Sequence, residues 1–202
     1  MINVAGQTLF DRTLDLARTV NPARIVSNLH YKAEMLASHL SGSDVQVIVE
    51  APDILDTGGG LRNALPLLGP YPVMTTNTDA IWVGPNPFEV LLDAWAPEKM
   101  DALLVCIPLE NCIGRAGTGD FDLKDTGRLE RGKTHVYGGV QILKTDLLSE
   151  VPEPAFSMNK IWDQMDASGR LFGVKYPGRW CDIGTPEGIQ LAEDLLRQHA
   201  DD

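Results

Sequence analysis

The chain has 202 residues, of which 44% are hydrophobic and 22% are charged, a composition typical of a globular domain. Its formal net charge of −11 argues against nucleic-acid binding, because a polyanionic partner requires a basic surface. No apolar run approaches the roughly 18 residues that cross a bilayer, and the N-terminus lacks a signal-peptide pattern. The three cysteines have no metal-ligand spacing and fit a reducing compartment. We therefore expect a cytoplasmic protein with no membrane or nucleic-acid partner, and a monomer by default.

Strands and helices alternate through the first half of the chain. Apolar residues at helical spacing predict helices over 8–20, 31–40, 59–68 and 88–95. Runs rich in β-branched and apolar residues predict strands over 24–29, 45–50, 71–75 and 102–108. The second and fourth of these strands are almost continuously apolar, as in strands buried on both faces. This alternation predicts an α/β fold with a mostly parallel, doubly wound sheet.

The second half changes character. Its predicted elements are a hairpin over 121–131 around Asp125-Thr126-Gly127, a strand over 136–143, a helix over 159–167, a strand over 171–176 and a helix over 186–198. Thr185 is placed to cap the last helix, with Pro186 at its first position. No repeat and no long linker interrupts the chain, so we expect a single domain over residues 1–202.

Two aspartates at predicted strand ends are the strongest chemical signal. Asp79 closes Asn77-Thr78-Asp79 after one strand, and Asp182 lies in Trp180-Cys181-Asp182-Ile183-Gly184. Each alone could be a turn or capping residue, because such side chains bond their own backbone. Together, at one edge of a sheet, two carboxylates predict a Mg²⁺ site, since Mg²⁺ is held by one or two carboxylates plus substrate phosphates.

A glycine run, Asp56-Thr57-Gly58-Gly59-Gly60, opens the third predicted helix. Three consecutive glycines have a backbone-entropy cost, which indicates that something approaches the main chain closely. The run is neither a Walker loop nor a dinucleotide fingerprint. The glycine run is either a ligand-binding segment or a flexible turn.

The remaining polar positions allow two interpretations each. Asn159, in Phe156-Ser157-Met158-Asn159, is either a helix cap, as Ser157 could also be, or a polar contact to a sugar. His30 follows a predicted strand, and it either faces a cleft or is a capping residue at the surface. The histidines support no Ser-His-Asp arrangement.

Several motifs together carry a family resemblance. They are Val4-Ala5-Gly6-Gln7-Thr8-Leu9, Asp56 to Gly60, Asn77-Thr78-Asp79, Ala116-Gly117-Thr118-Gly119, Tyr137-Gly138-Gly139-Val140-Gln141, Phe156-Ser157-Met158-Asn159 and 178–187. In this order they resemble the sugar-1-phosphate nucleotidyltransferases. Within that class the chain looks most like the short bacterial N-acetylmuramate 1-phosphate uridylyltransferases and mannose-1-phosphate guanylyltransferase-like proteins, over essentially its whole length.

The resemblance implies a chemistry and a set of site residues. A sugar 1-phosphate attacks the α-phosphorus of an NTP, UTP in the closest case, to give an NDP-sugar and pyrophosphate with Mg²⁺ bound. By position, Asp79 and Asp182 match the metal ligands. The matches for nucleotide binding are Thr57, Gly58 and Asn77, and those for sugar binding are Gly119, Tyr137 and Asn159.

The chain also departs from the family pattern. The family has a first strand, a glycine-rich loop and a Pro-Lys-Pro before the Val-Ala-Gly stretch, and its catalytic Arg and Lys would precede Met1. We therefore expect that Met1 is an internal methionine of a protein longer by roughly 20 residues. We also expect the chain as given to be inactive or weak, because cations that stabilise the transferring phosphate are missing. The rival interpretation is a noncatalytic or regulatory sugar-nucleotide-binding protein.

Overall fold

The computed structural model describes residues 1–200, and it divides the chain into two compact units. The first unit contains residues 1–21, 74–142 and those from 169 onward. The second contains residues 22–73 and 143–168.

The first unit begins with a short ribbon and a helix. Strands β1 (Asn3–Val4) and β2 (Gln7–Thr8) pair antiparallel and lead directly into α1 (Leu9–Arg18). Thr8 caps this helix, because its Oγ1 accepts a hydrogen bond of 3.0 Å from the Asp11 N–H. The predicted helix over 8–20 is therefore present, with Thr8 as its cap.

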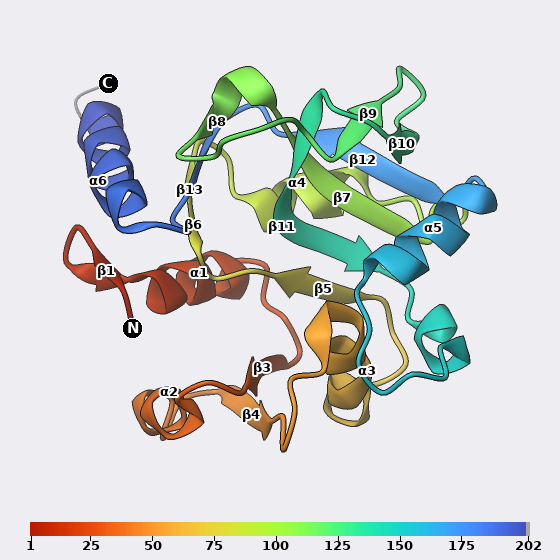
Figure 1. Ribbon diagram of the computed structural model, residues 1–202, viewed down its shortest axis with the longest axis horizontal. Coiled ribbons are helices and arrows are strands. Elements are labelled where there is room, and N and C mark those ends of the chain that lie inside the picture. The colour runs from red at the N-terminus through yellow and green to blue at the C-terminus, as the bar shows by residue number, and fades with distance from the viewer. Residues whose placement is uncertain (201–202) are drawn as a thin grey trace. The chain divides into compact units, whose positions relative to one another are not determined.

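The main sheet of the first unit has the order β10-β9-β11-β7-β12, with β5 paired to β11 (Figure 1). Its strands are β5 (Val73–Thr76), β7 (Ala102–Pro108), β9 (Phe121–Leu123), β10 (Leu129–Arg131), β11 (His135–Leu143) and β12 (Leu171–Lys175). Every residue of β7 is buried, as its apolar sequence predicts, and β7 runs parallel to β12. The helix α4 (Pro87–Ala94) packs against β7, and Asn86 caps it through a bond from the Phe88 N–H.

A smaller sheet in the same unit carries both aspartates at one of its ends. Strand β13 (Arg179–Asp182) lies between β6 (Ala80–Val83), which is antiparallel to it, and β8 (Cys112–Ile113), which is parallel. The helix α6 (Pro186–Ala200) packs against β13 (Figure 1). The short 3₁₀ helix η1 (Leu109–Asn111) joins β7 to β8.

The second unit has a two-stranded parallel sheet, β3 (Ile25–Leu29) and β4 (Val45–Val49), connected by α2 (Ala33–His39). Its other elements are α3 (Asp56–Leu68), η2 (Asp146–Glu150) and α5 (Asn159–Ala167). Helix α3 packs on β3, η2 and α5. This packing buries a set of apolar side chains that includes Leu61, Leu148, Phe156, Ile161 and Met165.

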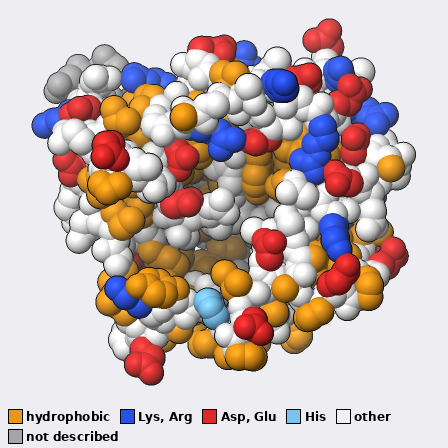
Figure 2. All heavy atoms as spheres, viewed as in Figure 1, with side chains coloured by type: hydrophobic (Ala, Val, Ile, Leu, Met, Phe, Trp, Pro, Cys, Tyr) orange, Lys and Arg blue, Asp and Glu red, His pale blue; other side chains and the backbone are white. Residues whose placement is uncertain are grey.

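Some expectations from the sequence need correction. The 45–50 segment is not buried on both faces: Val49 is 52% exposed, and in the part of the chain that the structure describes β4 pairs with β3 alone. Orange side chains over α2, β3 and β4 (Figure 2) agree with the exposure of Tyr31 and Met35. The sheets are also separate and mixed, rather than one mostly parallel sheet. Part of the antiparallel pairing arises where a connection is short, as in the predicted hairpin of β9 and β10 around Gly127.

Short strands were the elements that the sequence pattern missed. The sequence prediction did not include β1, β2, β6 or β8, each of two to four residues. Such short runs carry too few alternations for a period to be detected. Among the described residues, no helix combines the length and the apolar character that a membrane span needs.

Candidate active site

Asp79 and Asp182 lie together at one end of the smaller sheet. Asp182 is the last residue of β13 and pairs in register with Ala80, the residue directly after Asp79. The Ile183 N–H donates a hydrogen bond of 2.9 Å to the Asp79 carbonyl, which fixes the two chain segments at this point. The sequence prediction that both carboxylates share one sheet edge is therefore confirmed.

The surroundings of Asp79, including the charge of Asp182, raise its pKa. Partial loss of hydration raises the pKa of Asp79, and a hydrogen bond from its own backbone amide opposes this effect. The charge of Asp182 raises the pKa of Asp79 further. Within the described part of the chain, neither aspartate forms an ion pair with Lys or Arg. A divalent cation between them would relieve the repulsion.

This donor set fits Mg²⁺ better than a metal that needs a complete protein cage. In the described residues no cluster of three or more His, Cys, Asp or Glu side chains could hold a metal. Two carboxylate groups are what Mg²⁺ takes from a protein when substrate phosphates supply other oxygens. Gly184 has no side chain beside the Asp182 carboxylate. A Cβ at position 184 would lie 3.5 Å from Asp182 Oδ1, so its absence leaves this side of the carboxylate open.

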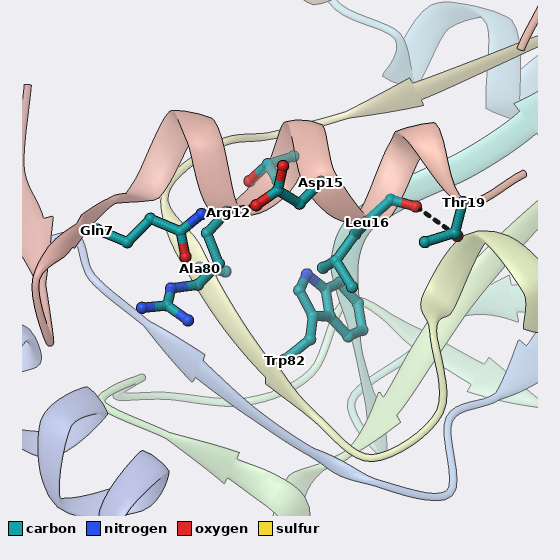
Figure 3. A pocket seen from close by; sticks show the side chains of 8 residues that line it. Gln7, Arg12, Asp15, Leu16, Thr19, Ala80 and Trp82 are labelled. Atoms are coloured by element: carbon teal, nitrogen blue, oxygen red, sulfur yellow. Dashed lines mark hydrogen bonds between the residues drawn. The ribbon is translucent and has the colours of Figure 1, made fainter. Parts of the chain in front are cut away.

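A hollow of about 300 Å³ lies beside the first residues of β6. Figure 3 shows Gln7, Arg12, Asp15 and Leu16 along one side, with Ala80 and Trp82 of β6 opposite. Gln7 donates a 2.7 Å hydrogen bond to Asp15, and Arg12 donates one of 3.0 Å to the Val4 carbonyl. The rim is therefore held by bonds within the first unit.

The predicted residues on and around β11 are held mainly by protein contacts. The Asn77 N–H donates to the Gly139 carbonyl at 3.0 Å, which ties the segment before Asp79 to β11. Tyr137 has a hydrogen bond with Thr75, and loss of hydration raises the pKa of its phenol well above the ordinary range despite that bond. Thr75 also accepts a 3.0 Å bond from the buried Gln141.

Gly119 lies where no other residue fits. A Cβ there would come within 2.4 Å of the His135 carbonyl oxygen, because the chain at 119–120 pairs with His135 through a 2.7 Å bond from the Asp120 N–H. The Asp120 carboxylate in turn accepts bonds from the Tyr137 N–H and from Arg115. The glycine allows this close packing, and the structure thus gives it a structural role.

The glycine run of α3 is approached closely, as its sequence predicts, but by the protein's own chain. A Cβ on Gly58 would lie 2.4 Å from the Phe156 ring, and one on Gly59 would lie 2.4 Å from the Pro154 carbonyl oxygen. The Gly58 and Gly59 N–H groups both donate to the Phe156 carbonyl, at 2.8 and 3.1 Å. These helix-start donors are therefore already satisfied within the second unit. Thr57 is exposed, although its Oγ1 accepts a 2.9 Å bond from the Met158 N–H.

A buried carboxylate beneath the glycine run was not recognised in the sequence. Glu50, which is 7% exposed, accepts hydrogen bonds from the Asn28 side chain at 2.9 Å and from the Leu55 N–H at 2.8 Å. Asn28 also donates to the Gly60 carbonyl at 2.7 Å. His30, one of the ambiguous positions, bonds the Glu50 carbonyl. The available signal was an acidic residue directly after an apolar strand.

Arg62 makes contacts that no local sequence pattern reveals. It lies one turn after Gly58 and donates to carbonyl oxygens of Leu148, Val151, Glu153 and Pro154. No local pattern could have found these contacts, because the partners are more than 80 residues away in the chain. Asn159 begins α5, is exposed, and donates to Ser157 Oγ at 3.1 Å through its side chain.

Comparisons with known proteins agree with this arrangement of elements. Residues 1–121 match the MobA-like NTP transferase domain. N-acetylmuramate alpha-1-phosphate uridylyltransferase from Caulobacter vibrioides is 32% identical over 98% of the chain and 88% of that protein. The chain belongs to the MobA-like NTP transferase family.

Other similar proteins share less sequence identity with the chain. The bifunctional protein GlmU from Burkholderia mallei is 30% identical over 97% of the chain, which spans only 47% of that protein. HddC from Yersinia pseudotuberculosis, complexed with GMP-PN, has a TM-score of 0.77 at 20% identity, covering 97% of this chain and 88% of that one. A putative glucose-1-phosphate thymidylyltransferase from Bacillus anthracis has a TM-score of 0.78 at 15% identity, with 97% and 85% covered. These two structures show that the NTP transferase has the α/β nucleotidyltransferase fold.

Proposed function

We propose that this NTP transferase transfers a uridylyl group from UTP to N-acetylmuramate 1-phosphate, giving the UDP-sugar and pyrophosphate. The observation that carries the proposal is the meeting of Asp79 and Asp182 at one end of the β6–β13 pair. The choice of substrates is supported by the Caulobacter vibrioides relative, which is similar over nearly the whole chain. We also propose that residues 1–202 act as one nucleotidyltransferase domain, of the doubly wound type of its family.

In this reaction a phosphate oxygen of the sugar 1-phosphate forms a bond to the α-phosphorus, and the bond from that phosphorus to pyrophosphate breaks. The attacking oxygen is already anionic, so the protein needs no strong general base. When bound at Asp79 and Asp182, Mg²⁺ would neutralise charge on the phosphoryl oxygens. The two aspartates would hold that charge in a fixed place, and positioning would supply much of the remaining rate enhancement.

The other predicted residues divide between the two substrates. Thr57, Gly58 and Asn77 are proposed to line the nucleotide side. Gly119, Tyr137 and Asn159 are proposed for the sugar side, where the exposed amide of Asn159 is the group with most freedom to bond a hydroxyl. Gly58 and Gly119 would act by letting chain segments pack closely, in keeping with the contacts that a Cβ would make at each.

The test is release of pyrophosphate from UTP plus N-acetylmuramate 1-phosphate, with Mg²⁺ and with the metal chelated. Weak release that depends on both substrates and on Mg²⁺ is the expected result. Release only from GTP plus mannose 1-phosphate would overturn the substrate assignment and keep the reaction class. Failure with every substrate pair, combined with measurable binding of the nucleotide sugar, would identify a noncatalytic binding protein.

A pair of variants tests the role of the carboxylates. Asp182→Asn should lower kcat/KM by about a hundredfold or more, because it removes the charge that holds the metal while keeping the side-chain shape. Asp93→Asn, an equal change of charge at an exposed position on α4, should leave kcat/KM unchanged. Equal effects of the two substitutions would show that Asp182 acts only through the overall charge of the protein.

A further inference from the structure

Arg62, in the middle of α3, connects this helix to residues 148–154. Its Nη1 donates to the carbonyls of Leu148 and Val151, and its Nη2 donates to those of Glu153 and Pro154 at 2.6 and 3.1 Å. Its Cζ also lies 4.8 Å from the centroid of the Phe156 ring. A planar guanidinium with five donors suits several carbonyls at once, whereas a lysine ammonium has three donors on a flexible stem.

The segment that Arg62 holds leads directly to a predicted sugar contact. Beyond Pro154, the Phe156 N–H donates to the Leu55 carbonyl at 3.1 Å, and the Phe156 carbonyl accepts from Gly58 and Gly59. Two residues later the Met158 N–H donates to Thr57 Oγ1, and the next residue is Asn159. A continuous series of bonds therefore runs from Arg62, through 153–158, to Asn159.

The segment that contains Pro152 and Pro154 depends on the Arg62 guanidinium for hydrogen bonds to its carbonyls. Pro152 and Pro154 have no N–H, so this part of the segment cannot form a regular ladder of backbone bonds. Its carbonyls instead converge on one guanidinium. Loss of the Arg62 guanidinium would leave these carbonyls without their charged donor. The segment would then be free to move away from Gly58 and Gly59 of α3.

We infer that Arg62 is a positioning residue, which sets Asn159 in place relative to Thr57 through the segment 153–158. This inference rests on the proposed function, in which Asn159 contacts the sugar and Thr57 lies on the nucleotide side. In this inference Arg62 acts through that segment, because its guanidinium is bonded to the segment's carbonyls. Its loss should therefore change recognition of the sugar phosphate more than recognition of UTP.

The test compares two arginines of the second unit that each donate to backbone carbonyls. Arg62→Gln removes the donors that α3 directs at residues 148–154. Arg24→Gln is the matched control, since Arg24 donates to the carbonyls of Leu67 and Leu68 at the C-terminal end of α3. We expect Arg62→Gln to raise the KM for the sugar 1-phosphate by roughly tenfold, with a much smaller change for UTP. Arg24→Gln should alter neither KM.

Two further measurements separate positioning from a general loss of structure. Arg62→Lys keeps a cation beside Phe156 and should restore part of the affinity for the sugar phosphate. Hydrogen exchange of the Met158 amide, measured in the full chain without substrates, should quicken in Arg62→Gln and stay unchanged in Arg24→Gln. An equal rise in both KM values, or an unchanged Met158 amide in Arg62→Gln, would overturn the inference.

These readouts also distinguish failure of the proposed function. If the unmodified chain turns over no pair of substrates, the proposed function fails and the Met158 amide alone decides whether Arg62 positions the segment. If the chain is active and Arg62→Gln keeps its KM for the sugar phosphate, the function stands and the inference fails.

Discussion

At the end of β13 in the first unit, the carboxylates of Asp79 and Asp182 meet, and in the described residues no basic side chain pairs with either. At the start of α3 in the second unit, the corresponding polar groups have partners: the Gly58 and Gly59 N–H groups bond Phe156, and Glu50 accepts from Asn28 and Leu55. The first region leaves charge for something outside the chain to neutralise. In the second region the polar groups form hydrogen bonds with other residues of the chain. A motif of polar and glycine residues can thus mark either a ligand site or an internal joint, by which we mean a place where two segments of the chain pack and bond together. The contacts of the motif distinguish the two.

The largest expected effect tests the second region as an internal joint. Gly59→Ala should destabilise the protein by about 3 kcal/mol, because its Cβ would lie 2.4 Å from the Pro154 carbonyl oxygen and 3.3 Å from the Ala155 Cα. The better helix propensity of alanine, about 1 kcal/mol, offsets only part of the clash. Urea unfolding measures the loss. A stability equal to that of the unmodified chain would show that segment 154–156 does not pack on the glycine run.

A somewhat smaller loss is expected from a neutral substitution beneath α3. Glu50→Gln should cost about 2 kcal/mol, because both Glu50 oxygens face donors, the Asn28 amide and the Leu55 N–H. A glutamine must turn its own NH₂ toward one of them. Asn28 cannot flip to compensate without losing its bond to the Gly60 carbonyl. If the substitution is neutral by urea unfolding, the carboxylate is not needed to hold the helix start.

How far the sequence could predict each region follows from the range of the contacts. The apolar run over 102–108 identified a buried strand because its signal is local, whereas the run over 45–50 did not show which face would be covered. The Asp79–Asp182 pair could be anticipated only in part: Asp182 ends β13, but Asp79 directly precedes β6, a strand missed from the sequence that pairs antiparallel with β13. The contacts of Arg62 and Phe156 could not, since they join residues about 90 positions apart and depend on which helix packs where.

The glycine run shows why a correct inference can name the wrong partner. The sequence predicted that something approaches the backbone at Gly58 and Gly59, and something does. Backbone entropy says only that space is needed, not what fills it. The occupant, residues 154–156, becomes known only from the packing.

The third prediction tests the first region as a place for an outside cation. Mg²⁺ at ten times its dissociation constant should stabilise the unmodified protein by about 1.4 kcal/mol, and Asp79→Asn or Asp182→Asn should abolish this response. The measurement is the change in Tm on adding MgCl₂ at neutral pH. Because the pKa of Asp79 is raised above its ordinary value of 3.8, the folded state holds that proton to higher pH than the unfolded chain does.

The pH dependence of that response has a definite sign. Without metal, the contribution of Asp79 to stability is lost as the pH rises from 3.8 through the folded pKa, since its charged form is disfavoured in the fold. With Mg²⁺ the order reverses, because the metal requires the charged form and its stabilising effect should fade as the pH falls through the same interval. A Mg²⁺ response that persists in Asp79→Asn at every pH would place the metal elsewhere.

The smallest expected effect on stability distinguishes the two regions most clearly. It tests whether a glycine leaves room for a bound ligand or for a neighbouring segment of the chain. Gly184→Ala adds a Cβ 3.5 Å from Asp182 Oδ1 and 3.9 Å from Oδ2, an ordinary contact at an exposed position with no unusual backbone angle. Stability should therefore change by no more than about 0.5 kcal/mol, in contrast to Gly59→Ala. The added methyl group nevertheless flanks the carboxylate on which a cation would sit, so the Mg²⁺-dependent rise in Tm should shrink. A large loss of stability with an intact Mg²⁺ response would reverse the assignment, making the end of β13 an internal joint like the start of α3.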